Sequence, residues 1–319
     1  MQIIFVLVAM VLGILYNYNF TGFTFNCNLC LFAGLTIVLP SLLNLRFGDL
    51  SLVITKKNII IKNIFANYII LPIIAIVIGL LTNDFGIAGG IFLLSVLAGG
   101  GMVMHWIKES NSDEKVGIVL FCINIFFLLL SFYLFRHFSM IFADIFSTNG
   151  TTATLVNHLP LRDVLKNLII IPLITSIVLR IFLPIIPKLM QKNRKMISNI
   201  SIFLIVFYLF ALENNNIIMT IDTLVFMKAL IATIAFYISC FIIAKALYNT
   251  SNTEERAAFW HLFTRYITIA LAISAYSSSL TFGTTIILPI MIAYFIQIPF
   301  SIYYSKVLLK DTKEAAVNS

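Results

Sequence analysis

Two apolar stretches of this 319-residue chain carry residues that could bind an ion or a small anion. In the first, Gly99, Gly100 and Gly101 interrupt a run that a bilayer would otherwise accept. Glycine disfavours a helix by about 1 kcal/mol relative to alanine, so three in succession predict a break. The freed backbone groups then need protein or a water-filled cavity around them, as at the substrate sites of secondary transporters. The alternative is a kinked packing helix that uses glycine for close approach.

The second stretch places Thr264, Arg265 and Thr268 inside an otherwise apolar segment. A charged side chain at the centre of a bilayer costs at least ~2.5 kcal/mol on insertion scales, so Arg265 needs a cavity or a partner. We predict that it binds an anionic substrate or replaces a coupling cation. The alternatives are a backbone carbonyl partner and snorkelling towards the cytoplasmic end of the segment.

His105 follows the glycine run and titrates near neutral pH, so it could relay protons. The alternative is an interfacial histidine beside Trp106. The sequence contains no P-loop, no Gly-x-Ser-x-Gly motif and no metal-spaced His/Cys cluster. We therefore do not expect an enzyme, and we expect no cofactor other than a coupling ion.

Composition places these stretches in a membrane protein. The chain is 61% hydrophobic and 11% charged, with a mean hydropathy of +1.03, whereas soluble domains are about 25% charged. The net charge of +8 fits basic cytoplasmic loops better than nucleic-acid binding.

A membrane span needs about 20 apolar residues, and on that scale the chain reads as an all-α polytopic protein with about ten spans. The predicted spans are residues 3–16, 28–45, 64–81, 86–107, 116–135, 164–186, 196–212, 224–247, 257–278 and 282–308. Residues 47–62 are amphipathic and are predicted to lie at the surface. Basic residues gather in the loops on the N-terminal side of the membrane, which predicts a multi-pass protein of a bacterial inner (plasma) membrane with both termini cytoplasmic.

The spans divide into two sets of five, and an odd number per set means that the second set enters from the opposite side. This pattern predicts two inverted repeats, residues 1–140 and 164–308, joined by an outer loop at 141–163 and followed by a cytoplasmic tail at 309–319. The fourth and ninth spans then correspond to each other. We expect both to be broken helices that cross.

Four segments resemble the bile acid:sodium symporter superfamily and, within it, the arsenical-resistance efflux permease branch. Residues 39–50 resemble the end of that family's second span, and residues 285–307, with Pro289 and Pro299, resemble its last span. Residues 100–106 resemble the arsenite permeases' T-A-M-V-F-V-W, and residues 263–268 lie where those permeases have A-R-N-S-E. The resemblance implies a secondary transporter.

The resemblance also implies ligands that this chain lacks. Arsenite permeases carry a Cys where Gly99 stands, and a thiolate suits a soft thiophilic centre. The bile acid symporters bind sodium with a Ser-Asn pair in the first broken helix and with Glu and Gln in the second, but no carboxylate is present at the matching positions here. Ser95, Thr264, Thr268 and backbone carbonyls remain as oxygen ligands for Na⁺.

We therefore predict a secondary-active transporter of a small organic anion or metabolite that works by alternating access, with Na⁺ or H⁺ as coupling ion. Helix N-termini at the breaks would favour the anion. The alternatives are an arsenite-type efflux permease and a transporter-derived membrane sensor or scaffold without transport. The predicted substrate and ion site consists of Gly99, Gly100, Gly101, Met104, His105, Thr264, Arg265 and Thr268.

Overall fold

The computed structural model describes residues 2–20, 22–23, 28–33, 35–36, 39, 43, 52–100, 102–146, 166–182, 194–211, 222–277 and 284–317. Most of these residues are helical, and none of them forms a strand longer than an isolated bridge. In chain order the helices are α1 (Gln2–Asn19), α2 (Asn28–Ala33), α4 (Leu52–Thr55), α5 (Lys57–Phe65), η3 (Ala66–Ile70), α6 (Leu71–Thr82), α7 (Phe85–Val96), α8 (Val103–Glu109), α9 (Glu114–Phe126), α10 (Leu128–Ile145), η4 (Lys166–Ile170), α13 (Ile171–Phe182), α15 (Arg194–Phe210), α17 (Thr223–Leu247), α18 (Thr253–Phe263), α19 (Ile267–Ser277), η7 (Thr284–Ile286) and α20 (Ile287–Val317).

Three helical segments in the described part of the chain are long and apolar enough to cross a membrane: Lys57–Thr82, Thr223–Leu247 and Ile287–Lys310. A bent pair, α9 and α10, forms a fourth candidate with an angle of 44° between its two helices. The predicted membrane-protein class is therefore confirmed. The arrangement as ten spans in two inverted repeats stays a prediction.

Several predicted boundaries differ from the structure. The predicted surface segment 47–62 is not separate from the following span, because α5 continues through η3 into α6 as one helix with Lys57 and Lys62 exposed near its start. Long basic side chains can extend from a span into the interface, which allows the span to begin earlier than its apolar run suggests. The fifth predicted span ends at residue 135, but α10 continues to Ile145. The last predicted span ends at residue 308, but α20 continues to Val317. Most of the predicted outer loop lies outside the described residues.

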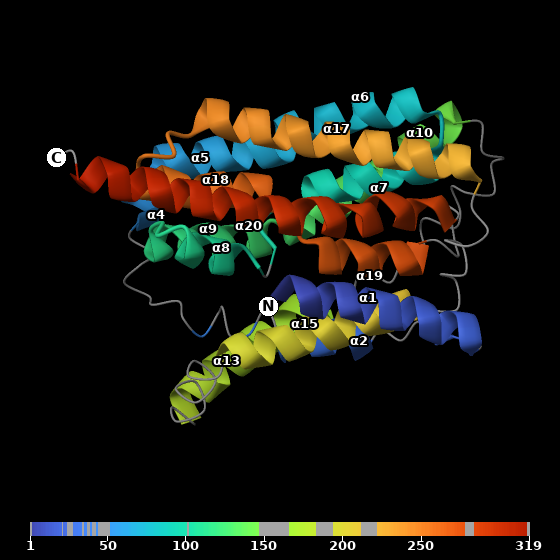
Figure 1. Cartoon of the computed structure of the whole chain (residues 1–319), viewed down its shortest axis with the longest axis horizontal. Helices are drawn as coiled ribbons and strands as arrows, with labels where there is room; N and C mark the ends of the chain where they lie inside the picture. Colours follow the sequence, from blue (N-terminus) through green and yellow to red (C-terminus); the bar gives the residue numbers. More distant parts are fainter. Residues whose placement is uncertain are drawn as a thin grey trace.

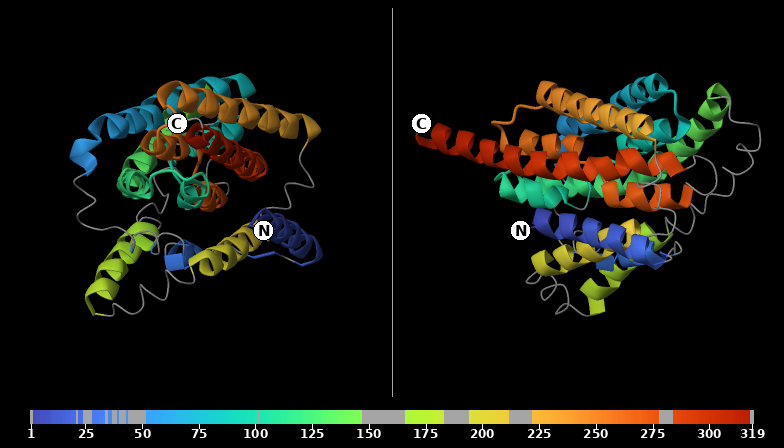
Figure 2. Two further views of the ribbon diagram at one scale, coloured as in Figure 1. Left: turned by 60° about the vertical axis from the view of Figure 1, so that its left-hand side comes forward. Right: turned by 45° about the vertical axis from the view of Figure 1, so that its right-hand side comes forward.

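The helices form two groups (Figures 1 and 2). The smaller group contains α1, α2, α13 and α15, and the larger group contains α5 to α10 and α17 to α20. Helices α1 and α15 pack closely along each other. A Cβ built on Gly13 of α1 would lie 2.7 Å from the Phe207 carbonyl of α15, so this pair is in backbone contact. Contact between the two groups includes that of α15 with α19.

Exposed apolar side chains form rows along helices on the outward surface of the larger group. On α17, the exposed side chains Ile231, Ile234, Ile238 and Ile242 follow a spacing of three or four residues, which puts them on one face of the helix. On α6, Leu81 is 82% exposed. Apolar stripes of this extent are unusual on soluble monomers and suit contact with lipid tails.

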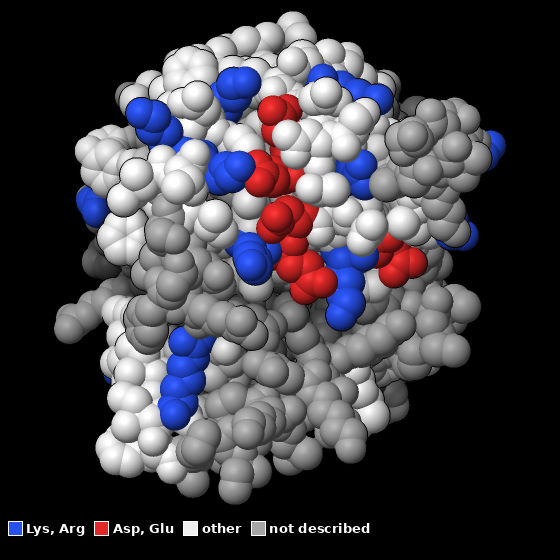
Figure 3. Space-filling model, turned by 90° about the vertical axis from the view of Figure 1, so that its left-hand side faces the viewer, with Lys and Arg blue, Asp and Glu red and all other residues white. Residues whose placement is uncertain are grey.

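Charged side chains gather at one end of the molecule, the end at which α20 finishes (Figures 1 and 3). Figure 3 shows acidic side chains across the middle of this face with basic side chains around them. Lys56 and Glu254 form an ion pair there, with an N–O distance of 2.7 Å. The Asp113 and Asn252 side chains cap the N-termini of α9 and α18, which begin at this face.

Candidate functional site

Two helices of the larger group are interrupted. The first interruption lies between Val96, the last residue of α7, and Val103, the first residue of α8. The second lies between Phe263, which ends α18, and Ile267, which begins α19. The two interruptions are paired antiparallel through an isolated bridge, so the two broken helices run in opposite directions where they meet. The breaks predicted in the fourth and ninth spans are thus present.

Each interruption satisfies backbone groups of the other. The Gly99 N–H donates to the Thr264 carbonyl at 3.0 Å, and the Tyr266 N–H donates to the Leu97 carbonyl at 2.9 Å. A break in a membrane helix otherwise leaves such groups unpaired at several kcal/mol each. We call this paired region, residues 97–100 and 264–266, the crossing.

Glycine is required at the crossing for two reasons. Gly99 has φ +58°, a left-handed conformation that residues with a Cβ rarely adopt. A Cβ there would also lie 2.5 Å from His261 Nδ1 and 2.6 Å from Asn124 Nδ2. At Gly100, a Cβ would lie 2.8 Å from the Arg265 carbonyl oxygen. Gly101, the third residue of the predicted run, lies outside the described residues.

Arg265 is 1% exposed, so the predicted alternative of snorkelling is wrong. The other alternative, a carbonyl partner, is present, because Nη1 donates to the Ser95 carbonyl at 3.2 Å. Nε and Nη2 have no hydrogen-bonding oxygen or nitrogen among the described residues. The Cys240 thiol and the phenols of Tyr68 and Tyr237 are the neighbouring groups with which the guanidinium interacts.

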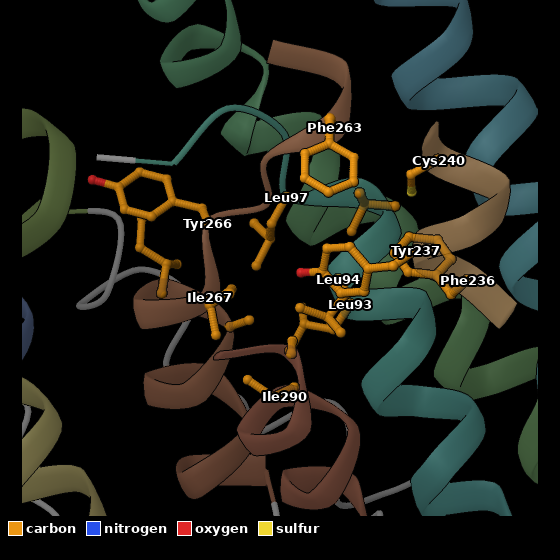
Figure 4. Close-up of a cluster of buried hydrophobic side chains, with 14 of the residues drawn as sticks. Leu93, Leu94, Leu97, Phe236, Tyr237, Cys240, Phe263, Tyr266, Ile267 and Ile290 are labelled. Carbon is orange, nitrogen blue, oxygen red and sulfur yellow. The ribbon is translucent and has the colours of Figure 1, made fainter. Parts of the chain in front are cut away.

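No described acidic side chain balances this charge. Among the side chains whose burial the structure describes, two arginines, Arg256 and Arg265, are buried, and every aspartate and glutamate is half-buried or exposed. Figure 4 shows the apolar surroundings of the crossing, where Leu97, Phe263 and Ile267 lie near Tyr237 of α17. The guanidinium therefore has uncharged neighbours, the Cys240 thiol and the phenols of Tyr68 and Tyr237, and no described acid beside it.

Gln297 of α20 holds the backbone of the second break. Its Oε1 accepts the Arg265 N–H at 2.6 Å and the Tyr237 hydroxyl at 2.9 Å, and its Nε2 donates to the Arg265 carbonyl at 3.4 Å. Gln297 is absent from the predicted site residues. An amide side chain inside an apolar segment is the only signal that the sequence offers for it.

His261 also supports the crossing, because its ring lies next to Gly99. Its Nε2 lies 2.8 Å from the Gly117 carbonyl, which can only accept, so Nε2 carries the proton in the neutral ring. Nδ1 then accepts from the Asn124 amide nitrogen at 3.1 Å. Both ring nitrogens are thereby used by the protein, and His261 acts as a packing and positioning residue. Its contacts come from residues more than 130 positions away, and the sequence does not show them.

The remaining predicted site residues lie beside the crossing. Met104 is buried in α8, and its sulfur would lie 3.5 Å from a Cβ built on Gly117 of α9. His105 is half-buried, with its ring centroid 4.8 Å from that of Trp106 in an edge-to-face arrangement. Thr268 is half-buried in the first turn of α19.

Two of the three side-chain oxygens predicted for Na⁺, those of Ser95 and Thr264, donate hydrogen bonds to nearby carbonyls. The Ser95 hydroxyl donates to the Phe92 carbonyl at 2.7 Å, and the Thr264 hydroxyl donates to the Trp260 carbonyl at 2.5 Å. The Ser95 carbonyl accepts from Arg265. Hard cations need several oxygen ligands, usually including carboxylates or carbonyls directed at the ion. No described carboxylate is buried at the crossing, and the Arg265 guanidinium lies on the Ser95 carbonyl, so the described residues disfavour a sodium ion here.

The comparison with known protein families gives one match. The family model for the sodium bile acid symporter family matches residues 29–220, which is more than half of the chain and includes the first break and its flanking helices. No curated protein matches the chain. The α18–α19 break lies beyond the matched residues. The chain therefore belongs to the sodium bile acid symporter family, a family of membrane transporters.

Proposed function

We propose that this protein is a secondary-active transporter that carries a small organic anion or metabolite across the membrane by alternating access. The family supports transport in general, and the paired breaks support the crossing as the place where substrate binds. Discontinuous helices that meet inside a membrane protein are the usual construction of a transporter's binding site. The site would be formed by residues near Gly99, Gly100, Thr264 and Arg265.

The observation that carries the choice of an anion is the unbalanced charge of Arg265. A buried charge is costly unless an opposite charge or polar groups compensate it, and the described residues supply the Ser95 carbonyl, the Cys240 thiol and no acid. An incoming anion would add the missing negative charge. The 11-residue helix α19, which begins next to Arg265, adds the partial positive charge of its N-terminus.

In alternating access, the two helix groups would move relative to each other. We propose ten spans in two inverted repeats, with residues 1–140 and 164–308 as the repeats and with movement between the α1/α2/α13/α15 group and the larger group. A bacterial inner (plasma) membrane with both termini cytoplasmic is part of this proposal.

The first experiment measures ligand-dependent unfolding of the purified protein with a panel of carboxylates, sulfonates and phosphate esters, and with neutral analogues of the same size. A ligand at a hundredfold excess over its Kd stabilises the folded state by about 2.7 kcal/mol. Stabilisation by one anion class, lost in Arg265→Ala but kept in Arg180→Ala, would support the proposal. Arg180 is a suitable control because it is an arginine of α13 in the other helix group.

The second experiment measures flux of the stabilising anion into proteoliposomes, with and without a Na⁺ or pH gradient. Flux that depends on the protein and saturates with substrate is expected. Binding without flux would favour the alternative of a membrane sensor or scaffold. Flux of arsenite in place of organic anions would favour the arsenite-type permease.

A further inference from the structure

The structure places a side-chain cation, the Arg265 guanidinium, at the crossing of a chain whose family is named for sodium symport. We propose that the Arg265 guanidinium is a built-in cation of the crossing, which links the two broken helices and makes the binding state independent of Na⁺. The consequence for transport rests on the proposed function. The structural role of Arg265 does not.

The guanidinium connects one break to the end of the other helix. Arg265 belongs to the break between α18 and α19, and its Nη1 donates to the carbonyl of Ser95 in the last turn of α7. The last carbonyls of a helix carry partial negative charge, equivalent to about half an electron charge at the C-terminus. Both α7 and α18 end at the crossing, so their C-terminal ends face a region where a cation is favoured.

The other carbonyls at the end of α7 are also occupied by donors from the protein. The Val96 carbonyl accepts the Ser131 hydroxyl of α10 at 2.6 Å, and the Leu97 carbonyl accepts the Tyr266 N–H at 2.9 Å. Together with Ser95 and Arg265, three consecutive carbonyls have donors from distant segments. A sodium ion at this position would share these carbonyls with their present donors and would lie beside a second positive charge.

Neighbouring residues hold the backbone from which the guanidinium extends. Gln297 bonds both the N–H and the carbonyl of Arg265, and Gly100 allows the Arg265 backbone to approach the first break. The side chain therefore starts from a backbone held by α20 and reaches α7. Arg265 is 1% exposed, so in this arrangement its guanidinium lies inside the protein at the crossing. The cation is thus a permanent part of the crossing.

The test compares thermal unfolding of the purified full-length protein in NaCl, KCl and choline chloride at equal ionic strength. We expect the wild-type midpoint to be the same in all three salts. Arg265→Ala should unfold at a lower temperature, and millimolar methylguanidinium chloride should restore part of the loss. Arg180→Ala is the control and should show no response to methylguanidinium.

If Arg265→Ala does not fold, Arg265→Lys and Arg265→Gln test the same point. Both keep most of the side-chain volume, but only the lysine keeps the charge, so the lysine variant should unfold at the higher temperature. A sodium-specific rise of the wild-type midpoint would overturn the proposal. So would an equal or greater stability of Arg265→Gln, or an Arg265→Ala variant that folds but is not restored by methylguanidinium.

The outcomes separate this inference from the proposed function. Restoration by methylguanidinium without any anion response or flux would support the built-in cation and contradict the proposed transport function. Anion flux that requires a Na⁺ gradient would support the proposed transport function and contradict the built-in cation. Anion flux with the same rate in Na⁺ and choline is the outcome expected from both.

Discussion

Gln297 accepts the backbone N–H of Arg265 at 2.6 Å and so ties α20 to the interruption between α18 and α19. The same oxygen accepts the Tyr237 hydroxyl of α17, so one amide joins three helices. A residue outside both broken helices thereby determines the backbone geometry of the crossing. The contacts of Gln297 lead to the first prediction.

Gln297→Leu should lower the free energy of unfolding by about 2 kcal/mol or more, because it leaves the Arg265 N–H and the Tyr237 hydroxyl buried without an acceptor. Chemical denaturation in detergent measures the change. Ser301→Ala on the same helix is the matched control, since the buried Ser301 hydroxyl has no hydrogen-bond partner among the described residues. A similar loss in both variants would contradict the role given to Gln297.

Gly99→Ala should disrupt the crossing. The left-handed backbone alone costs roughly 1–2 kcal/mol for a residue with a Cβ, and the new methyl group would meet His261 and Asn124. Anion-dependent stabilisation should be lost with it. Gly117→Ala is a milder comparison, because its Cβ would meet the flexible end of the Ile107 side chain at 2.6 Å. Equal effects of the two substitutions on the unfolding midpoint would argue against a special requirement at Gly99.

His261→Phe should destabilise the protein by about 2 kcal/mol or more, because it leaves the Asn124 amide and the Gly117 carbonyl without their partner. His105→Phe should cost less, since His105 is half-buried at α8. Urea or guanidinium unfolding of the two variants gives the comparison. A larger effect at His105 would contradict the positioning role given to His261.

Trp260→Phe should lower the free energy of unfolding by about 1 kcal/mol. The indole Nε1 donates to the Ser110 hydroxyl at 2.8 Å, and phenylalanine keeps much of the ring packing without the donor. Ser110→Ala removes the same bond from the other side. The double variant should therefore cost less than the sum of the two single losses, as measured by a double-mutant cycle. Additive losses would show that the bond contributes nothing.

The sequence predicted the two breaks because each has a local cause. Three glycines weaken a helix wherever it lies, and Arg265 with its threonine neighbours cannot sit in lipid without a partner. The pairing of the two breaks followed from the expected correspondence of the fourth and ninth spans. These features depend on residue type and spacing, which the sequence contains.

The contacts that support the crossing could not be predicted in the same way. Asn124 and His261 are 137 positions apart, and Arg265 and Gln297 are 32 apart, so no periodic pattern connects them. Met104 and His105 stay predicted site residues; the Met104 sulfur lies towards Gly117 of α9, and the His105 ring lies beside that of Trp106. The continuity of α5 with the next span was not predicted, because the lysines of α5 resemble those of a separate surface segment.

The shared hydrogen bonds of the crossing have a consequence for synthesis of the chain. The segment containing Leu97 and Gly99 is made and inserted long before Thr264 and Tyr266, its backbone partners, leave the ribosome. Until then, its free N–H and C=O groups lie in a membrane without those bonds, at a cost of several kcal/mol each. The first half of the protein therefore completes its fold only after the second half has been inserted, and truncation before Thr264 should yield a product that membrane proteases remove.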